Sequence, residues 1–581
     1  MRQARVLRMM VPSLATLLAL GACGGGGGSA SSTPTPNGVA NVQITDGPGD
    51  EFQHVWVTVT SLAFHTSPDQ VWSASDATWI TKTLPAPVTL DLASLNNGTL
   101  NSTLFAGLSL PQGTYRQIRF FFDGAEAPLD ASALATVDSN GAALQWNDQV
   151  EYLAPGTTQA TESPLEIAYP TQGIQLQGSF TVGAGAALNL AVDFDLERII
   201  VPFNHDGQTY FTMRPNLQYF DLSQSAAITG TIDPTHLCPS AAAALAQAPA
   251  CAFNIVVKAE TLAADGSRHV VARETMADPV TGRFTLFPLA TKDASGNAIA
   301  SYDVLIRGRN LETMIVTAVP VTAGTSPAGT GTTAATAVQT AALAPVLNSG
   351  EYTAQLATPL APLTSGYVAF EQTLPGAGAV PYEVRWRNTD PFTGSFRNPI
   401  PLQGASSQLH VASYNNGATL AFAATAPAEG AGAFRVAANE AVYYNLSPAS
   451  VMPAPVAGTT QTFTPGTPTL AAGVNPGTIN ASLTFSNISV DNNCELVLAR
   501  FATIVGTYNC SAMLGSNGGS NAGSIVLSGI PSGVPGAYYY AYVRLWETGH
   551  GKLTRRIVAL PGFVDLRTSS TQSLNGSVPG A

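Results

Sequence analysis

The sequence predicts an all-β protein in which several tandem β-sandwich domains follow a flexible, lipidated N-terminal tether. Charged residues make up only 11% of the chain, against ~25% in typical soluble domains. The 54 glycines and 40 prolines indicate frequent turns, and short runs with period-two alternation of apolar residues recur between them. Because 581 residues exceed what one core usually serves, about three to five domains are expected.

Residues 1–22 have the features of a signal peptide. Arginines at positions 2, 5 and 8 precede the apolar run 11–20, and small residues follow it. This run is shorter than the ~20 residues that span a bilayer. Leu20-Gly21-Ala22-Cys23 matches the bacterial lipobox, which predicts cleavage before Cys23 and acylation of its sulfur, palmitate included. A plain secretory signal with an incidental cysteine is the alternative.

Residues 23–38 are predicted to form the tether. Five glycines from Gly24 to Gly28 precede a segment rich in Ser, Thr and Pro, and neither part has an apolar face to bury. Several acyl chains on one cysteine would hold such a tether stably at a bilayer. We therefore expect a cell-envelope protein that is anchored by lipid, with the outer membrane as the expected location.

The other four cysteines are predicted to form two disulfides in an oxidising compartment. Cys238 and Cys251 lie 13 positions apart, and Cys494 and Cys510 lie 16 apart. Four cysteines allow three connectivities, of which the two local loops are preferred here. No Cys-x-x-Cys spacing is present, so the pattern does not indicate a thiolate metal site.

The formal net charge of −12 falls to −15 without the three arginines of the leader. An acidic chain without a basic stripe repels phosphate backbones, so nucleic acid is excluded as an expected partner. No nucleotide or cofactor motif is recognisable, and no cofactor is expected.

Three segments show the clearest strand patterns. Residues 55–60 alternate, with Val55, Val57 and Val59 on one face; residues 116–122 and 188–195 are also β-rich. Around them, the motifs at 42–50, 55–59, 90–95, 110–119, 193–194 and 214–215 follow one another in an order that resembles the bacterial family domain of unknown function 4382. The resemblance covers residues 39–222 and implies a β-rich domain of exported lipoproteins, without an assigned activity.

The next segment, 226–340, resembles the carboxypeptidase regulatory-like, transthyretin-related β-sandwich through short motifs at 228–232, 278–286 and 302–308. The motif Asp278-Pro-Val-Thr-Gly-Arg-Phe284 recurs 112 residues later as Asp390-Pro-Phe-Thr-Gly-Ser-Phe396. Its Asp, Pro and Gly are typical of a turn, so the recurrence predicts a second β-sandwich over 341–452. Two unrelated turns with similar chemistry would give the same residues.

The Pro/Thr-rich segment 453–475 is predicted to be a linker, and residues 476–581 a C-terminal β-domain. Within that domain, alternation divides the run from Tyr538 to Trp546 into two faces. Residues 539, 541, 543 and 545 form the expected core face. Tyr538, Tyr540, Tyr542 and Arg544 form the other face, which fits either a sugar-stacking platform or ordinary sheet packing.

A search for catalytic motifs is negative. There is no Gly-x-Ser-x-Gly elbow, no His-Glu-x-x-His and no P-loop. Asp46, Asp50, Asp193 and Asp195 are the candidate ligands for a calcium ion. A solvated strand face carrying Asp193, Asp195 and Glu197, together with Asx-turns at Asp46 and Asp50, explains the same residues.

Two function hypotheses remain. The first is a membrane-anchored, non-catalytic surface or periplasmic lipoprotein that acts as a binding or scaffold module for a protein or glycan ligand. The second is a secreted carbohydrate-active enzyme with accessory β-sandwich modules, because paired catalytic carboxylates can be distant in sequence. A cleft holding two carboxylates would favour the enzyme, and flat sandwiches would favour the scaffold.

Overall fold

The computed structural model describes most of the chain from residue 36 to residue 580. Within that range it leaves out positions 48, 50, 102, 155–156, 158, 215–216, 239–250, 253, 294, 309–310, 328–334, 341–347, 356–365, 392–394, 403–407, 417, 431–432, 441–442, 446, 448, 453–468, 489–492, 501–502, 515–520 and 550–551. Cys23, the signal peptide and nearly all of the predicted tether lie outside the described residues. The first strand begins at Asn37, so the predicted tether ends two residues earlier than expected.

The described chain is almost entirely β-structure, as predicted. Its N-terminal sandwich, Asn37–Asp221, packs a four-stranded sheet on an eight-stranded one. The first sheet consists of β12 (Gln218–Asp221), β9 (Ala187–Asp193), β1 (Asn37–Thr45) and β4 (Phe105–Pro111). The second consists of β10 (Ile200–His205), β11 (Gln208–Met213), β7 (Ala160–Glu166), β6 (Gln149–Leu153), β2 (Phe52–His65), β5 (Gly113–Phe122) and β8 (Ile174–Val182), with β3 (Ile80–Asp91) paired to β2. The predicted core valines 55, 57 and 59 are fully buried between these sheets.

Short helical turns connect the strands of this sandwich. They are the 3₁₀ turns η1 (Leu92–Leu95) and η2 (Pro170–Gln172) and the helices α1 (Ala131–Ala135) and α2 (Leu196–Ile199). Among the described residues, no helix is long and apolar enough to cross a membrane.

The middle segment, Ala226–Met452, begins with a second sandwich. One sheet consists of β16 (Arg283–Leu289), β13 (Ala226–Ile232), β19 (Thr336–Thr340) and β25 (Thr419–Leu420). The other consists of β15 (His269–Met276), β14 (Val256–Leu262), β17 (Ser301–Gly308), β18 (Leu311–Pro320), β24 (Leu409–Ser413) and β26 (Ala423–Thr425). The turn η3 (Pro234–His236) follows β13.

This pairing differs from the predicted boundary at residue 340. Strands β24, β25 and β26 belong to the segment 341–452, yet β24 extends the sheet beyond β18 and β25 pairs with β19. The rest of that segment forms its own sheets from β22 (Pro381–Asn388), β21 (Gly366–Thr373), β27 (Phe434–Glu440), β29 (Ser450–Met452), β20 (Asn348–Gln355) and β23 (Ser395–Leu402). The two predicted sandwiches therefore share strands, because edge strands of the first sandwich are completed by chain from the second.

The two copies of the repeated motif share a backbone hydrogen bond. Asp278 N–H donates to the Arg283 carbonyl and Asp390 N–H to the Ser395 carbonyl, both at 2.8 Å. In the first copy, Gly282 has a φ of +68°, where a Cβ would meet the Ile232 carbonyl at 2.0 Å. The turn chemistry predicted for the first copy is therefore present, whereas residues 392–394 of the second lie outside the described residues.

The C-terminal sandwich, Asn475–Pro579, has a core of its own. One sheet consists of β34 (Asn521–Ser532), β31 (Asn475–Ser486) and β38 (Thr571–Pro579). The other consists of β33 (Thr503–Asn509), β32 (Asn493–Arg500), β35 (Tyr538–Gly549), β36 (Lys552–Ala559) and β37 (Val564–Asp565). Before it, β28 (Tyr444–Asn445) pairs with β30 (Thr469–Leu470), next to the predicted linker, of which residues 453–468 lie outside the described part.

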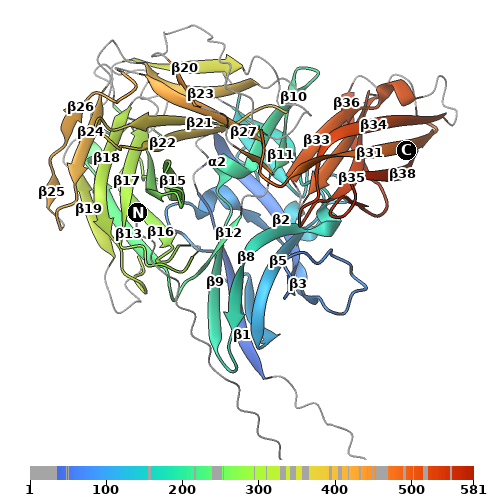
Figure 1. The fold of residues 1–581 in the computed structure, drawn as a ribbon, viewed down its shortest axis with the longest axis horizontal. Helices are drawn as coiled ribbons and strands as arrows, with labels where there is room; N and C mark the ends of the chain where they lie inside the picture. The colour runs from blue at the N-terminus through green and yellow to red at the C-terminus, as the bar shows by residue number, and fades with distance from the viewer. Residues whose placement is uncertain are drawn as a thin grey trace, which may run out of the picture.

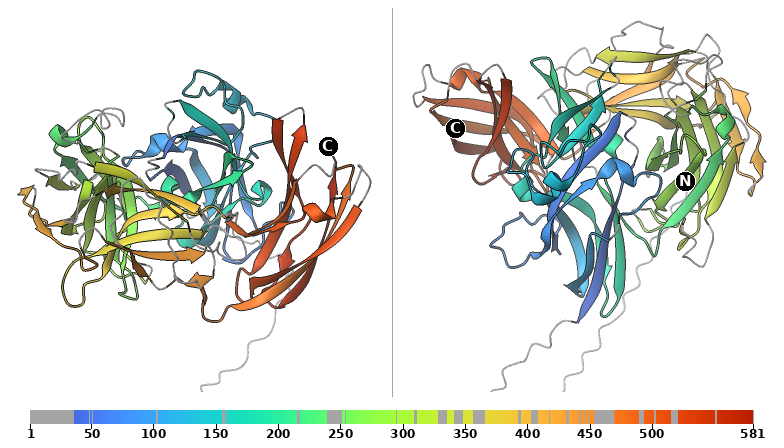
Figure 2. Two further views of the ribbon diagram at one scale, coloured as in Figure 1. Left: turned by 90° about the horizontal axis from the view of Figure 1, so that it is seen from above. Right: turned by 180° about the vertical axis from the view of Figure 1, so that it is seen from behind.

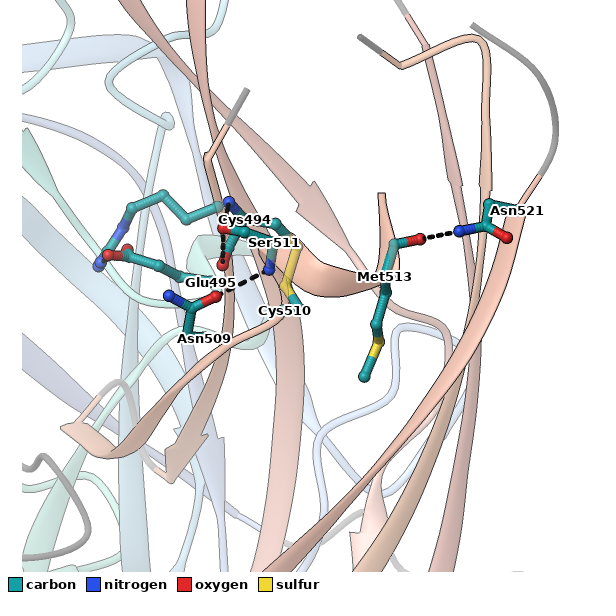
Figure 3. The surroundings of a disulfide bond; sticks show 8 residues. Cys494, Glu495, Asn509, Cys510, Ser511, Met513 and Asn521 are labelled. Atoms are coloured by element: carbon teal, nitrogen blue, oxygen red, sulfur yellow. Dashed lines mark hydrogen bonds and ion pairs between the residues drawn. A yellow bond between two sulfur atoms is a disulfide. The ribbon is translucent and has the colours of Figure 1, made fainter. Parts of the chain in front are cut away.

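Both predicted disulfides are present. Cys238 and Cys251 bridge with their Cα atoms 5.1 Å apart, and Cys494 and Cys510 with theirs 4.9 Å apart. Figure 3 shows the second bridge joining β32 to the turn η4 (Ser511–Met513). The Ser511 hydroxyl accepts a hydrogen bond from Cys494 N–H at 2.9 Å. This hydrogen bond joins the same two segments as the disulfide.

The three parts of the chain are not arranged in space in the order of the sequence. In Figures 1 and 2 the N-terminal sandwich lies between the middle segment and the C-terminal sandwich. Its two flanks are therefore both covered by other parts of the chain, and the contacts on these flanks position the candidate site.

Candidate functional site

The stripe of tyrosines on β35 faces the N-terminal sandwich. Tyr538, Tyr540 and Tyr542 are at most 4% exposed and pack in one apolar cluster with Ala168 and Tyr169 of the N-terminal sandwich. Residues 539, 541, 543 and 545 point into the C-terminal core, as predicted. The stripe is therefore mainly an intramolecular interface, and we call this contact the aromatic seam.

A buried ion cluster closes one part of the aromatic seam. Glu166, at the end of β7, lies 2.6 Å from Arg544 and 3.0 Å from Arg555. The Tyr542 hydroxyl also donates a hydrogen bond to Glu166. Burial alone would raise the pKa of Glu166, but the two arginines outweigh it and hold the pKa below its usual range. Glu166 is therefore a fixed anion that joins the two sandwiches.

A cleft of about 520 Å³ opens above this ion cluster. Its walls come from both sandwiches, and the lining residues are Gly124, Ala125, Glu126, Ala127, Glu166, Ile167, Tyr169, Pro170, Thr171, Tyr542, Arg555, Arg556, Ile557 and Ala559. Arg555 contacts Glu126 at 2.6 Å as well as Glu166. One guanidinium thus bridges two carboxylates on the wall of the cleft.

A second, smaller hollow of about 340 Å³ shares Tyr169 with the cleft. Tyr169 has a left-handed backbone, with φ of 57° and ψ of 61°, a conformation that costs a non-glycine residue ~1–3 kcal/mol. Its hydroxyl donates to the Leu560 carbonyl of the C-terminal sandwich, and its ring lies 5.0 Å from Tyr540. These contacts across the seam hold Tyr169 in its strained conformation.

The opposite flank of the N-terminal sandwich is joined to the middle segment by charge. Lys258 on β14 is fully buried and lies 3.1 Å from Glu274, 3.7 Å from Glu383 and 3.8 Å from Glu197 of α2. Arg307 and Arg387 also contact Glu197, at 2.8 and 2.5 Å. We call this set of residues, with Asp193, Asp195, Arg198 and Arg273, the charged junction.

Three of the candidate calcium ligands, Asp46, Asp193 and Asp195, lie at the charged junction. Asp193 forms an ion pair with Arg273, and Asp195 contacts Arg198 at 3.0 Å. Burial raises the pKa of Asp46 well above its usual range, and the nearby Asp193 and Asp195 raise it further. Asp50 lies outside the described residues. Asp193 and Asp195 are thus paired with cations of the chain itself.

The prediction that Asp193, Asp195 and Glu197 share a solvated strand face is wrong. Strand β9 ends at Asp193, Asp195 adopts a left-handed backbone with φ of 44°, and Glu197 lies in α2. The chain turns at Asp195, so the period-two pattern does not continue past the strand. Burial and the neighbouring Glu274 raise the pKa of Asp195 well above its usual range, while Arg198 opposes them.

A different acidic group was missed by sequence reasoning. Asp138, Glu151 and Glu162 each bring one oxygen within 4.8 Å of the others, and they are the carboxylates among the described residues that gather in this way. The residues following Asp138, Ser139-Asn140-Gly141, form a turn in which Asn140 N–H donates to the Asp138 carboxylate and Ser139 N–H donates to the Glu151 carboxylate. The loop composition was a usable signal, but Glu151 and Glu162 come from strands β6 and β7, which the loop sequence does not identify.

The comparisons with known proteins support the N-terminal assignment. Residues 37–215 match the family described as domain of unknown function (DUF4382). No curated protein matches this chain. Among solved structures, the major pilin SpaA of Corynebacterium diphtheriae is 11% identical with a TM-score of 0.11, over 61% of this chain and 99% of that chain. A TM-score this low carries no argument about fold or function.

Proposed function

We propose that this chain is a membrane-anchored, non-catalytic lipoprotein of the cell envelope that binds its ligand in the cleft of the aromatic seam. The cleft of about 520 Å³ between the two sandwiches carries this proposal. Ligand sites are commonly concave and lie at domain interfaces, with a few polar groups among apolar ones. Tyr169, Tyr542, Ile557 and Arg555 supply such a mixture.

The anchoring part of the proposal rests on the lipobox ending at Cys23, with the acyl chains in the outer membrane. The finer assignment of residues 226–340 to the carboxypeptidase regulatory-like sandwich belongs to the same proposal and is supported by the two β-sheets at the start of the middle segment.

The anchor is tested by Cys23→Ser in cells. We expect the wild-type protein to fractionate with membranes and to incorporate radiolabelled palmitate, and the variant to lose both properties. Membrane retention of the variant with no acyl label on the wild type would contradict the anchor.

The binding site is tested by filling the cleft. Ala559→Trp places a large ring on the cleft wall, and Val526→Trp on β34 of the same sandwich, where Val526 is 64% exposed, is the matched control. Cells expressing each full-length protein are cross-linked, and the bound material is purified and identified by mass spectrometry. We expect a ligand that is recovered with wild type and control and reduced at least tenfold with Ala559→Trp; equal recovery from all three would reject the cleft.

One observation favours the enzyme hypothesis enough to require its own test. Glu126 and Glu166 both line the cleft, and paired carboxylates serve glycoside hydrolysis. Here Arg555 bridges them, and the low pKa of Glu166 makes it a poor proton donor. We expect no turnover of glycoside, ester or peptide substrates above background; activity that Glu126→Gln abolishes while the fold is intact would establish the enzyme instead.

A further inference from the structure

The smaller hollow of the aromatic seam has its own lining, distinct from the cleft except at Tyr169. It has a volume of about 340 Å³ and is lined by Gln70, Val71, Trp72, Ser73, Asp76, Tyr169, Gln172, Tyr540, Gly562 and Phe563. The segment before β3 supplies one wall, and β35 with the loop between β36 and β37 supplies the other. The hollow therefore exists only when the N-terminal and C-terminal sandwiches are docked.

Four aromatic residues line the hollow: Trp72, Tyr169, Tyr540 and Phe563. Trp72 is held by Trp79 at 5.2 Å and by Phe121 at 4.7 Å between ring centres. Across the hollow, Phe563 packs on Tyr540 at 6.0 Å but remains 43% exposed. An exposed aromatic ring beside a fixed indole offers flat apolar faces that need no rearrangement to bind a ligand.

Two polar atoms on the lining residues have no hydrogen-bond partner within the described chain. They are the Tyr540 hydroxyl and the Gln172 side-chain carbonyl, both buried from solvent. Tyr540 as a whole is only 4% exposed. Buried polar groups are nearly always hydrogen-bonded, and a phenol can donate while an amide oxygen accepts. A ligand that both accepts and donates hydrogen bonds would satisfy the two atoms.

The charge of the hollow further restricts the class of ligand that it can bind. Asp76 is the one acidic or basic residue in the lining, and hydrogen bonds from the Thr78 hydroxyl and backbone hold the pKa of Asp76 below its usual value. Its carboxylate is therefore ionised at neutral pH and repels anions. The Asp76 oxygens already accept hydrogen bonds from Thr78 N–H at 2.9 Å and from the Gln70 side chain at 2.7 Å. The carboxylate therefore has partners within the chain and does not require a bound cation.

We propose that this hollow binds a neutral carbohydrate chain. Sugar rings present apolar C–H faces that stack on Trp72 and Phe563, and hydroxyls that accept from the Tyr540 hydroxyl and donate to the Gln172 carbonyl. A quaternary ammonium ion would also suit aromatic walls, but it has no hydrogen to donate to Gln172. The inference deepens the proposed binding function, on which it rests, by assigning a ligand class to a second site.

The test titrates the full-length protein in detergent with maltohexaose, cellohexaose, anionic hexagalacturonate and tetramethylammonium, and binding is measured by calorimetry and by tryptophan fluorescence. We expect saturable binding of at least one neutral hexasaccharide with a change in fluorescence. Phe563→Ala should weaken it more than tenfold and Tyr540→Phe about fivefold, while Ala559→Trp in the cleft and Val526→Trp leave it unchanged.

Tyr540→Phe separates binding from a structural role, because it removes an unpartnered hydroxyl and should not lower the thermal midpoint. Binding of only hexagalacturonate or tetramethylammonium, binding that both hollow variants leave unchanged, or no binding of any probe would overturn the carbohydrate assignment. Such a result would leave the cleft untouched if cross-linked ligand is still lost with Ala559→Trp, so the failures of the two proposals are distinguishable.

Discussion

The N-terminal sandwich contacts its two neighbours through interfaces of opposite chemistry. The charged junction buries Lys258 among three glutamates and places Glu197 between two arginines. The aromatic seam buries tyrosines and one ion cluster around Glu166, and it leaves the cleft and the hollow open.

The two interfaces differ in how exactly their partners must be placed. Buried ion pairs contribute little net stability but tolerate only one arrangement of partners, because any displacement leaves a charge unpaired. The apolar contacts of the aromatic seam do not depend on pairing each charge with a partner, and the cleft and the hollow lie open between them. We therefore infer that the charged junction sets the orientation of the N-terminal sandwich and that the aromatic seam carries the binding surface.

The largest expected effect comes from removing the central cation of the charged junction. Lys258→Met keeps the length of the side chain but leaves Glu197, Glu274 and Glu383 with one cation fewer. Breaking a buried ion pair typically costs about 3–5 kcal/mol, and we expect a loss of that order in the free energy of unfolding, measured by urea denaturation. Lys292→Met on an exposed loop is the control, and equal midpoints for the two variants would refute the role of the junction.

The pH dependence of the middle segment sharpens the comparison. Burial raises the pKa of Glu371 on β21 from 4.5 to about 7, despite the opposing charge of Arg435. A carboxyl with a raised pKa stabilises the fold while protonated, and that contribution, about 3 kcal/mol at most, is lost as the pH rises from 4.5 through 7. Glu166 in the seam has a lowered pKa and so behaves oppositely, since its contribution is lost as the pH falls.

We therefore expect Glu371→Gln to match the wild type in free energy of unfolding at pH 4.5 and to exceed it at pH 8. Chemical denaturation at both values measures the difference, with the exposed Asp206→Asn as control. A variant that is less stable than wild type at pH 8 would show that Glu371 is ionised and usefully paired in the fold.

These interfaces mark the limit of what the sequence predicts. The period-two alternation of apolar residues predicted strand β2, and the spacing of the cysteines predicted the disulfide between Cys494 and Cys510. Both predictions succeeded because the residues involved are close together in the sequence. Glu166 and Arg544 are 378 residues apart, and no local pattern links them. The predicted strand face of Asp193, Asp195 and Glu197 was wrong because β9 ends at Asp193 and the backbone turns at Asp195. The burial of these side chains depends on the neighbouring middle segment, which alternation along one strand does not reveal.

The disulfide of the C-terminal sandwich offers a test that is independent of both interfaces. Its loop of 16 residues corresponds to about 3 kcal/mol in the chain-entropy account. Replacing Cys494 and Cys510 together by alanine should lower the free energy of unfolding of this sandwich by that order. The matched replacement of Cys238 and Cys251 should act only on the middle segment, as followed by domain-resolved hydrogen exchange. Free thiols at these positions in the folded protein, or exchange effects that spread equally over all three parts, would contradict the local effect of each disulfide.

The smallest effect separates two tyrosines on one strand. The Tyr542 hydroxyl donates to the buried anion Glu166, whereas the Tyr540 hydroxyl has no hydrogen-bond partner within the described chain. A hydrogen bond to a charged group contributes about 1.5–3 kcal/mol, so Tyr542→Phe should lower the free energy of unfolding by about 2 kcal/mol. Tyr540→Phe should change it by less than about 0.5 kcal/mol or raise it, because removing an unpaired buried hydroxyl removes its desolvation cost.

The two substitutions are matched in size, strand and burial, so their difference in urea midpoint reports the hydrogen bond alone. It also tests the division of labour within the aromatic seam. If Tyr542 is structural and Tyr540 is held open for a ligand, stability should depend on the first hydroxyl and carbohydrate binding on the second. Equal losses of stability would mean that the Tyr540 hydroxyl is already satisfied within the fold, and the hollow would then lack the group that we assign to ligand recognition.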